Sequence, residues 1–257
     1  MELRETTRLI ISQVEKVTGI PVHVAEERSL KTLAVVRMAR EGAPAHVIAF
    51  NPTANMAPDY HISCECGFML RLYACPLEAR RKFVATPQGR REVETMLKGP
   101  NSVVVKMRLP ASMQNQLRDQ LFDGLMLQLR SMAIGMRVDR WLRRDYPDLN
   151  TLQEASARKQ MQDNSQALGP EVQQMAPEKI YRANVAMNGA FASFWSGILG
   201  DGRFVAPYKA TKHWSLSARL LEIESQIPDN PTEDFRLVDE WARECGLTGW
   251  YAWEPYE

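Results

Sequence analysis

The sequence predicts an α+β fold, with a small N-terminal antiparallel sheet followed by a mostly α-helical C-terminal half. Three short β-type runs separated by turn residues occur before residue 51, whereas the pattern after residue 110 is helical. A chain of 257 residues can bury one sizeable core or two modest ones. We therefore expect an α+β region at 1–110 and an all-α region at 111–257, with a further subdomain boundary near 169–177, where two prolines interrupt the chain.

The first elements alternate between helical and extended patterns. Residues 5–17 place apolar side chains at helical spacing, and Gly19 favours the end of that helix. Three β-type runs follow, at residues 20–24, 32–38 and 45–50. The glycine and proline of Arg40-Glu-Gly-Ala-Pro44 favour a turn between the last two runs, so we expect a hairpin there.

A helix beginning near Pro58 or Asp59 is expected to bury two faces, because apolar residues occur at helical spacing on both. One face contains Ile62, Cys66, Met69, Leu70 and Tyr73. The other contains His61, Cys64, Glu65, Phe68 and Leu72.

The rest of the chain predicts one further strand and then helices only. The strand is expected at 102–107, between two prolines. A Met- and Leu-rich helix is expected at 111–144, with a break near Gly135. Four more helices are expected at 152–168, 178–199, 216–226 and 234–245.

Composition predicts a cytoplasmic protein without a membrane anchor. The formal net charge of +1 gives no global electrostatic reason to bind nucleic acid or an anionic membrane. The longest apolar runs fall far short of the roughly 20 residues that span a bilayer. The N-terminal residues carry acids and lack the apolar segment of a signal peptide. Four cysteines make a poor disulfide framework for a chain of this size and suit a reducing compartment.

The most informative segment reads Cys64-Glu65-Cys66-Gly67-Phe68. In zinc proteases the motif His-Glu-x-x-His places two metal-binding imidazoles one helical turn apart, with the glutamate as general base. This chain keeps the glutamate, Glu65, but has cysteine at the first ligand position and phenylalanine, which cannot bind a metal, at the second.

The first 75 residues or so resemble the ImmA/IrrE-type zincin metallopeptidases. The matching stretches are Val47-Ile-Ala-Phe-Asn-Pro52 and Ile62-Ser-Cys-Glu-Cys-Gly-Phe-Met-Leu-Arg71. The resemblance implies a zincin-like fold in which Cys64 and Phe68 are degenerate metal positions and Glu65 is catalytic only if the site is active. It also implies a third, acidic ligand from a following helix, but spacing does not single out one of Glu78, Glu92 and Glu94.

Helical geometry leaves three interpretations of this motif. Cys64 and Cys66 point about 200° apart on a helix, so they do not chelate one ion. His61 does converge with Cys64, and a rebuilt zinc site would combine them with Cys75 or a glutamate. Alternatively Cys64 is a nucleophile activated by His61. In the third interpretation Cys64 and Phe68 are packing residues that fill a vacated metal pocket.

Two features outside the motif are candidate contact sites. Arg137, Arg140 and Arg144 share one helical face, which predicts either phosphate contacts or a solvated surface. The C-terminal stretch 249–256 is rich in aromatic residues, which either pack back onto the protein or bind a partner through Trp250 and Trp253.

Together these patterns predict a catalytically degenerate, zincin-like binding or regulatory protein that needs no cofactor and has another protein as its partner. The family resemblance adds a mobile-element or bacterial defence context, because genes of this family often lie beside a repressor. One alternative is a zinc metallopeptidase in which His61 and Cys64 hold the ion and Glu65 activates water. The other is a nucleic-acid-associated factor that uses Arg137 to Arg144.

Overall fold

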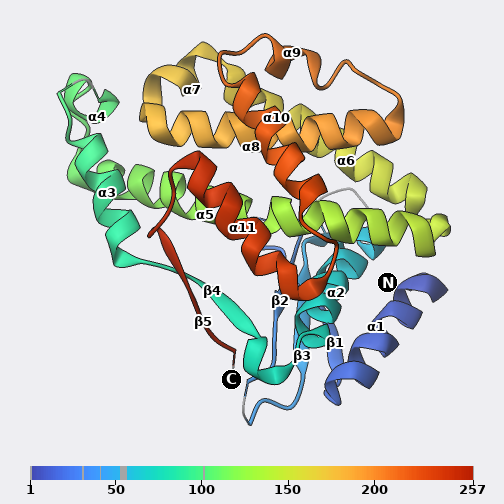
Figure 1. Ribbon diagram of the computed structural model, residues 1–257. Coiled ribbons are helices and arrows are strands. Elements are labelled where there is room, and N and C mark those ends of the chain that lie inside the picture. The colour runs from blue at the N-terminus through green and yellow to red at the C-terminus, as the bar shows by residue number, and fades with distance from the viewer. Residues whose placement is uncertain (1, 31, 41, 53–56, 101, 257) are drawn as a thin grey trace. The chain divides into compact units, whose positions relative to one another are not determined.

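The computed structural model describes residues 2–30, 32–40, 42–52, 57–100 and 102–256 (Figure 1). The chain divides into two compact units. Unit 1 consists of Met1–Arg81, Gly135–Ala157 and Pro255–Glu257. Unit 2 consists of Lys82–Ile134 and Arg158–Glu254. The expected α+β class is confirmed, with a small N-terminal sheet and a mostly helical C-terminal half.

Unit 1 begins with the predicted order of one helix, three strands and a second helix. Gly19 ends the first helix in a left-handed conformation with φ 70°, which glycine adopts without steric cost. The elements are α1 (Glu5–Thr18), β1 (Val22–Glu26), β2 (Ala34–Arg37), β3 (His46–Phe50) and α2 (Asp59–Ala74).

The sheet of unit 1 is mixed, and the prediction of an antiparallel sheet is wrong for one of its two pairings. Its strand order is β1-β3-β2, with β2 antiparallel to β3 as the hairpin predicts. Strand β1 instead runs parallel to β3, with Val24 opposite Ile48. The central position goes to β3 because it is the most apolar strand, with Ile48, Ala49 and Phe50 all buried.

Asp59, the first residue of α2, joins that helix to the start of α1. Its Oδ1 accepts the backbone N–H of Arg4 at 2.7 Å and the Thr7 hydroxyl at 2.8 Å. The carboxylate also lies at the N-terminus of α2, where negative charge is favourable. Ile10 and Val14 of α1 are fully buried, so α1 is held against the rest of unit 1 by its apolar face as well.

Helix α5 (Ala111–Asp145) contributes to both units, and the break expected near Gly135 does not occur. In unit 1 it is followed by the short 3-10 turn Pro147–Leu149 and by the first half of α6 (Asn150–Ser165). No helix in the described part of the chain is both long and apolar enough to cross a membrane.

Unit 2 is mainly helical, and two sequence predictions fail in it. The strand expected at 102–107 is a short helix, and β5 forms a strand in a half that was expected to be all-α. The remaining elements are β4 (Arg81–Ala85), α3 (Pro87–Leu97), α4 (Val103–Lys106), α7 (Pro170–Met175), α8 (Glu178–Leu199), α9 (Ala206–Lys209), α10 (Trp214–Gln226), α11 (Asp234–Cys245) and β5 (Tyr251–Pro255).

The two-stranded sheet is formed by β4 and β5, which lie side by side in Figure 1. The Thr86 N–H donates to the Trp250 carbonyl oxygen at one end, and the Tyr256 N–H donates to the Arg80 carbonyl oxygen at the other. The two strands are therefore antiparallel.

Helix α8 is the core of unit 2, as its small residues suggest. Ala183, Ala186 and Ala190 are fully buried, and a Cβ at Gly189 would lie 2.4 Å from the Ser217 Oγ of α10. Small residues on α8 thus let α10 approach closely. The polar side chain of Asn188 is satisfied inside this core, because its Oδ1 accepts the Gln128 Nε2–H at 2.7 Å.

Candidate functional site

The degenerate zincin motif lies on α2, in unit 1, and its two faces are buried to different extents. Ile62, Cys66 and Met69 have essentially no exposed surface, as expected for the core face. On the other face His61, Cys64, Glu65 and Phe68 are half-buried. That second face, which we call the motif face, is the candidate functional site.

Residues of α5 and α6 in the same unit approach this side of α2. A Cβ placed on Gly67 would lie 2.5 Å from Val138 Cγ1 and 3.1 Å from Trp141 Cζ3. One turn along α5, a Cβ on Gly135 would lie 3.6 Å from the Phe68 ring. The two glycines therefore allow α2 and α5 to pack closely, and α5 occupies the space beside the motif.

A buried polar cluster continues this packing towards the start of α2. The Tyr60 hydroxyl donates to Asp139 Oδ1 at 2.6 Å. Gln153 Nε2 donates to the Asp139 main-chain carbonyl at 2.9 Å and to its Oδ1 at 3.2 Å. Asp139 and Gln153 are buried, so these bonds satisfy polar groups that water does not reach. The Tyr60 side chain also forms a hydrogen bond with that of Cys64.

The environment of Cys64 keeps its thiol protonated. Removal from water raises the pKa of Cys64 well above the usual thiol range, and the negative charges of Asp139 and Glu65 raise it further. The hydrogen bond with Tyr60 lowers the pKa of Cys64, but by less than burial and the two negative charges raise it. A neutral thiol is a poor nucleophile, because the thiolate is the form that attacks.

Two of the other thiols, those of Cys66 and Cys245, also have raised pKa values, which gives a chemical prediction. Burial raises the pKa of both Cys66 and Cys245 to about 12. We expect iodoacetamide at pH 7.5 to modify Cys64, Cys66 and Cys245 at least about tenfold more slowly in the folded protein than in urea. Peptide mass spectrometry checks this, and rapid modification of Cys64 in the folded protein would revive its interpretation as a nucleophile.

His61 is held neutral on the same face. Burial lowers the pKa of its imidazole to about 4. Its Nε2 lies 3.3 Å from the Ser156 hydroxyl of α6, and its ring lies 5.0 Å from that of Tyr60. An uncharged His61 does not lower the pKa of Cys64 electrostatically, so the pair lacks the ion-pair character of an activated cysteine.

The depressed pKa of His61 predicts a pH-dependent stability. Between pH 4 and 6.5 the unfolded state binds more protons at His61 than the folded state, so stability falls as the pH falls through this window. The loss should be at most about 3 kcal/mol. Urea unfolding at pH 7 and pH 4.5 measures it.

The histidine variants make this measurement specific. His61→Gln should lose less stability than the wild type between these pH values. His23→Gln, which changes an exposed histidine of β1, should follow the wild type. An unchanged slope in His61→Gln would contradict the burial of a neutral imidazole.

The residues present do not fit a zinc ion. Among the described residues, no group of three or more His, Cys, Asp or Glu side chains is placed to hold a metal. Cys75, a predicted remote ligand, is buried and directs its thiol to the Arg71 carbonyl oxygen at 3.6 Å. Two of the three available acidic residues, Glu92 and Glu94, belong to unit 2 and form ion pairs there with Lys179 and Lys98.

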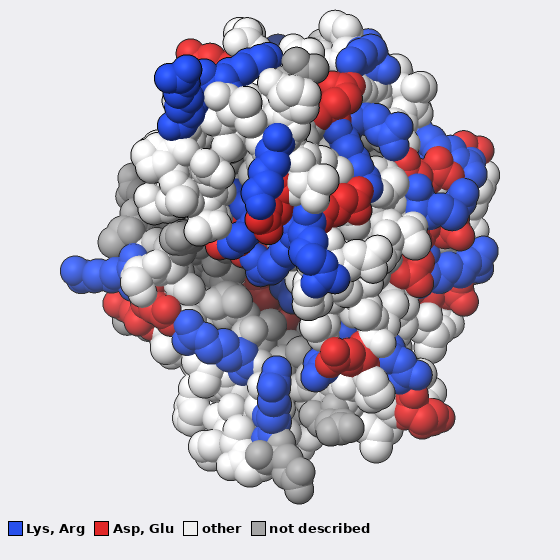
Figure 2. Space-filling view, turned by 90° about the vertical axis from the view of Figure 1, so that its left-hand side faces the viewer, with Lys and Arg blue, Asp and Glu red and all other residues white. Residues whose placement is uncertain are grey.

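The three arginines predicted to share an exposed face do not do so. Arg137 is fully buried, because α5 packs inside unit 1 at this point, and its guanidinium cannot contact a phosphate. Arg140 and Arg144 are exposed, and Arg144 is paired with Asp145 at 2.7 Å. On the face shown in Figure 2, Lys and Arg side chains stand beside Asp and Glu over much of the surface.

The two predicted aromatic contact residues differ in exposure. Trp250 is fully buried in unit 2, so its side chain is not available to a partner. Its Nε1–H donates to Glu92 Oε2 at 2.7 Å. Trp253 is half-buried, with its Nε1–H bonded to Asp239 Oδ1 at 2.8 Å. Trp250 thus follows the alternative in which the tail packs back onto the protein.

Sequence reasoning missed the residues that complete the site: Tyr60, Asp139, Gln153 and Ser156. Asp139 follows Tyr60 by 79 positions, and no spacing rule connects residues so far apart. Gly67 and Gly135 were the one sequence feature that could have indicated this contact, because a glycine inside a helix often marks a close approach of another element.

No protein-family model, curated protein or solved structure matches the chain.

Proposed function

We propose that this protein is a zincin-like binding protein without peptidase activity, which acts in the cytoplasm through a protein partner. The observation that carries the proposal is the packing of α5 against the motif face of α2 at Gly67 and Phe68. A metallopeptidase needs this face open to an ion, a water molecule and a substrate. Here Val138 and Trp141 of α5 lie against Gly67, and Gly135 of α5 lies beside the Phe68 ring.

The order of elements in unit 1 supports a zincin-like origin. A helix, three strands and a helix bearing Glu65 occur in the order that the resemblance implies. The mobile-element or defence context is carried by the resemblance alone. The sheet, α1 and α2 would then serve as a scaffold after loss of the metal positions Cys64 and Phe68.

The chemistry of the site favours binding over catalysis. Glu65 keeps the type of side chain that acts as a general base, but Cys64 is a neutral thiol and Phe68 has no donor atom. Rebuilding the zinc site with His61 and Cys64 provides two ligands, whereas catalytic zinc usually has three from the protein. The nucleic-acid alternative is weakened because Arg137, one of its three proposed phosphate contacts, is buried in the core.

Zinc binding tests the proposal directly. The protein is incubated with a threefold excess of zinc, freed of unbound metal on a desalting column, and analysed by inductively coupled plasma mass spectrometry. We expect about 0.1 zinc per chain or less, and the same value for Cys64→Ala, because no group of three or more ligand side chains is assembled among the described residues and Phe68 has no donor atom. Near-stoichiometric zinc that is lost in Cys64→Ala or His61→Gln would overturn the proposal in favour of a rebuilt metallopeptidase.

A further inference from the structure

The connection between α4 and α5 in unit 2 exposes apolar and basic side chains together. Val105 is 46% exposed, Met107 66% and Met113 51%. Lys106 and Arg108 alternate in sequence with Val105 and Met107 and are also exposed. We call these five residues the α4–α5 surface. The three apolar side chains lie within nine residues of one another in the chain, and contiguous exposed apolar patches often mark interaction sites.

This surface belongs to a structured turn. The Ser102 hydroxyl accepts the Val105 N–H at 3.3 Å, and the Leu109 N–H donates to the Val104 carbonyl at 3.1 Å. Gln114 Nε2 donates to the Leu109 carbonyl at 2.7 Å, which ties the turn to the start of α5. The side chains are therefore presented on a framework that needs little ordering when a partner binds.

The backbone of the turn is strained at Arg108. Within the described ranges Arg108 is the one non-glycine residue with a positive φ, 50°. A non-glycine residue rarely adopts this region unless its surroundings impose it. The hydrogen bonds on either side hold Arg108 in that conformation and place it next to Met107.

The stretch of sequence that contains this surface has basic residues and no acidic ones. Residues 95–118 contain four basic residues (Lys98, Lys106, Arg108 and Arg118) and no Asp or Glu, although the whole chain has a formal net charge of only +1. Among the described residues, neither Lys106 nor Arg108 forms an ion pair, whereas Lys98 pairs with Glu94 and Arg118 with Asp119. The charged groups of Lys106 and Arg108, on either side of Met107, are therefore available to a binding partner.

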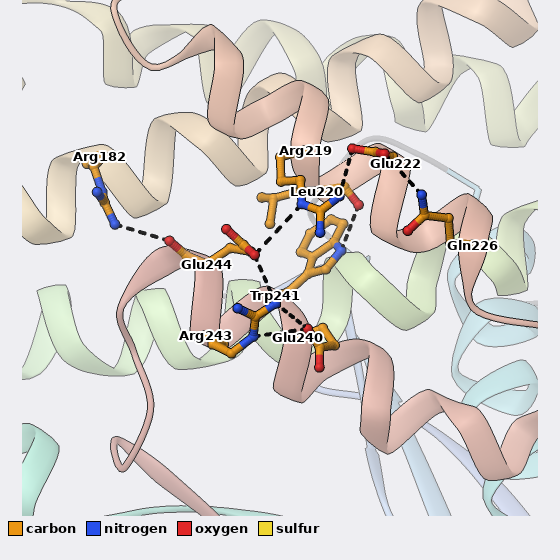
Figure 3. Close-up of polar contacts among 9 residues, drawn as sticks. All are labelled: Arg182, Arg219, Leu220, Glu222, Gln226, Glu240, Trp241, Arg243 and Glu244. Carbon is orange, nitrogen blue, oxygen red and sulfur yellow. Dashed lines mark hydrogen bonds and ion pairs between the residues drawn. The ribbon is translucent and has the colours of Figure 1, made fainter.

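The other basic side chains of unit 2 near α10 and α11 are arranged differently. Figure 3 shows Arg219 of α10 directed to Glu222 and Glu244, and Arg243 of α11 directed to Glu240 and Glu244. These arginines are neutralised by acidic neighbours in the same unit. Within the part of the chain that the structure describes, Lys106 and Arg108 of the α4–α5 surface have no such acidic neighbour paired with them and are open to acidic groups of another molecule.

We infer that the α4–α5 surface docks an acidic segment of another protein, one that carries at least two large apolar side chains. Apolar side chains of that segment cover Val105, Met107 and Met113, and its carboxylates meet Lys106 and Arg108. Methionine side chains adapt to different apolar shapes, which suits a surface of this kind. The inference rests on the proposed function only in taking a protein as the partner.

An anionic membrane is the competing occupant, and composition disfavours it. Membrane-surface segments commonly insert Trp, Phe or Tyr at the interface. Residues 95–118 contain none of these three residue types. The apolar contacts come from valine and methionine alone, which favours a protein groove or helix over a lipid surface.

Peptide selection tests the docking surface. The full-length protein is immobilised and exposed to a phage library of random 16-residue peptides, and enriched peptides are then measured by fluorescence anisotropy. We expect selected peptides with net charge of −2 or lower and two or more large apolar residues. Their affinity should fall at least tenfold for Met107→Asp and for Lys106→Glu/Arg108→Glu, and severalfold between 50 and 300 mM salt.

Met175→Asp is the matched control, because Met175 is also an exposed methionine of unit 2, at 44%. It should bind selected peptides as the wild type does. The inference is overturned if no peptide is enriched, if selected peptides are neutral or basic, or if Met107→Asp and Met175→Asp bind equally. It is also overturned if vesicles with 30% phosphatidylserine, rather than peptides, bind in a manner that Met107→Asp abolishes.

The zinc measurement separates the two proposals. If the protein holds no zinc and binds no peptide, the docking inference is wrong, but the proposed function is not contradicted. Stoichiometric zinc removes the proposed function whatever the peptides do.

Discussion

Replacing Trp250 by alanine is expected to lower the free energy of unfolding by about 3–5 kcal/mol. The indole is fully buried, 5.8 Å from the Phe122 ring, and the Lys179 ammonium lies 4.9 Å above it. Truncation leaves a large cavity beside α3 and α5 and removes the donor to Glu92. Guanidinium unfolding followed by far-UV circular dichroism measures the loss.

Trp253→Ala provides the comparison for this prediction. Trp253 is also an indole of β5 that bonds a carboxylate, but it is only half-buried. Its loss should cost about 1–2 kcal/mol, since less apolar surface returns to water. Equal effects of the two substitutions would contradict the burial of Trp250, and would restore it as a candidate partner contact.

Gly67→Ala is expected to destabilise the protein by about 1–3 kcal/mol, although alanine favours helices. The new methyl group would lie 2.5 Å from Val138 Cγ1. Val138 is fully buried and β-branched, so it cannot turn away without disturbing its own neighbours. Thermal and urea unfolding of the variant check the sign and the size.

Gly197→Ala is the control for Gly67→Ala, because it makes the same change inside helix α8 where no atom lies within 4 Å of the new group. There the helix propensity of alanine acts alone and should stabilise the protein by about 0.5–1 kcal/mol. Stabilisation by both substitutions would mean that α5 does not press against α2.

Local patterns predicted much of the fold. The α1 helix, the β2–β3 hairpin and the start of α2 follow from spacing and from glycine and proline. The pairing of β1 with β3 could not be predicted, because it depends on which strand takes the centre of the sheet. Strand β5 was missed because its partner β4 lies far away in sequence, and strand pairing of that kind leaves no local signature.

Local propensity also misled at two places. The run Val103-Val-Val105 is typical of a strand, yet Ser102 starts a helical turn there by accepting the Val105 N–H. Gly135 was expected to break α5, but it is retained inside the helix where the Phe68 ring approaches.

The site was only partly predictable for a similar reason. Helical geometry correctly separated the core residue Cys66 from the face that carries Cys64. It did not reveal that Asp139 lies behind Tyr60, or that Arg137 is buried. Those facts depend on how α5 packs against α2, which one sequence does not specify.

The central claim, that α5 fills the motif face of α2, is tested most directly by a double-mutant cycle between Gly67 and Val138. Gly67→Ala, Val138→Ala and the double variant are unfolded in urea under the same conditions. Removing the Val138 methyl groups makes room for the new methyl at position 67, so the double variant should lose at least about 1 kcal/mol less than the sum of the single losses. Losses that add within about 0.5 kcal/mol would contradict the claim, because residues that do not touch act independently.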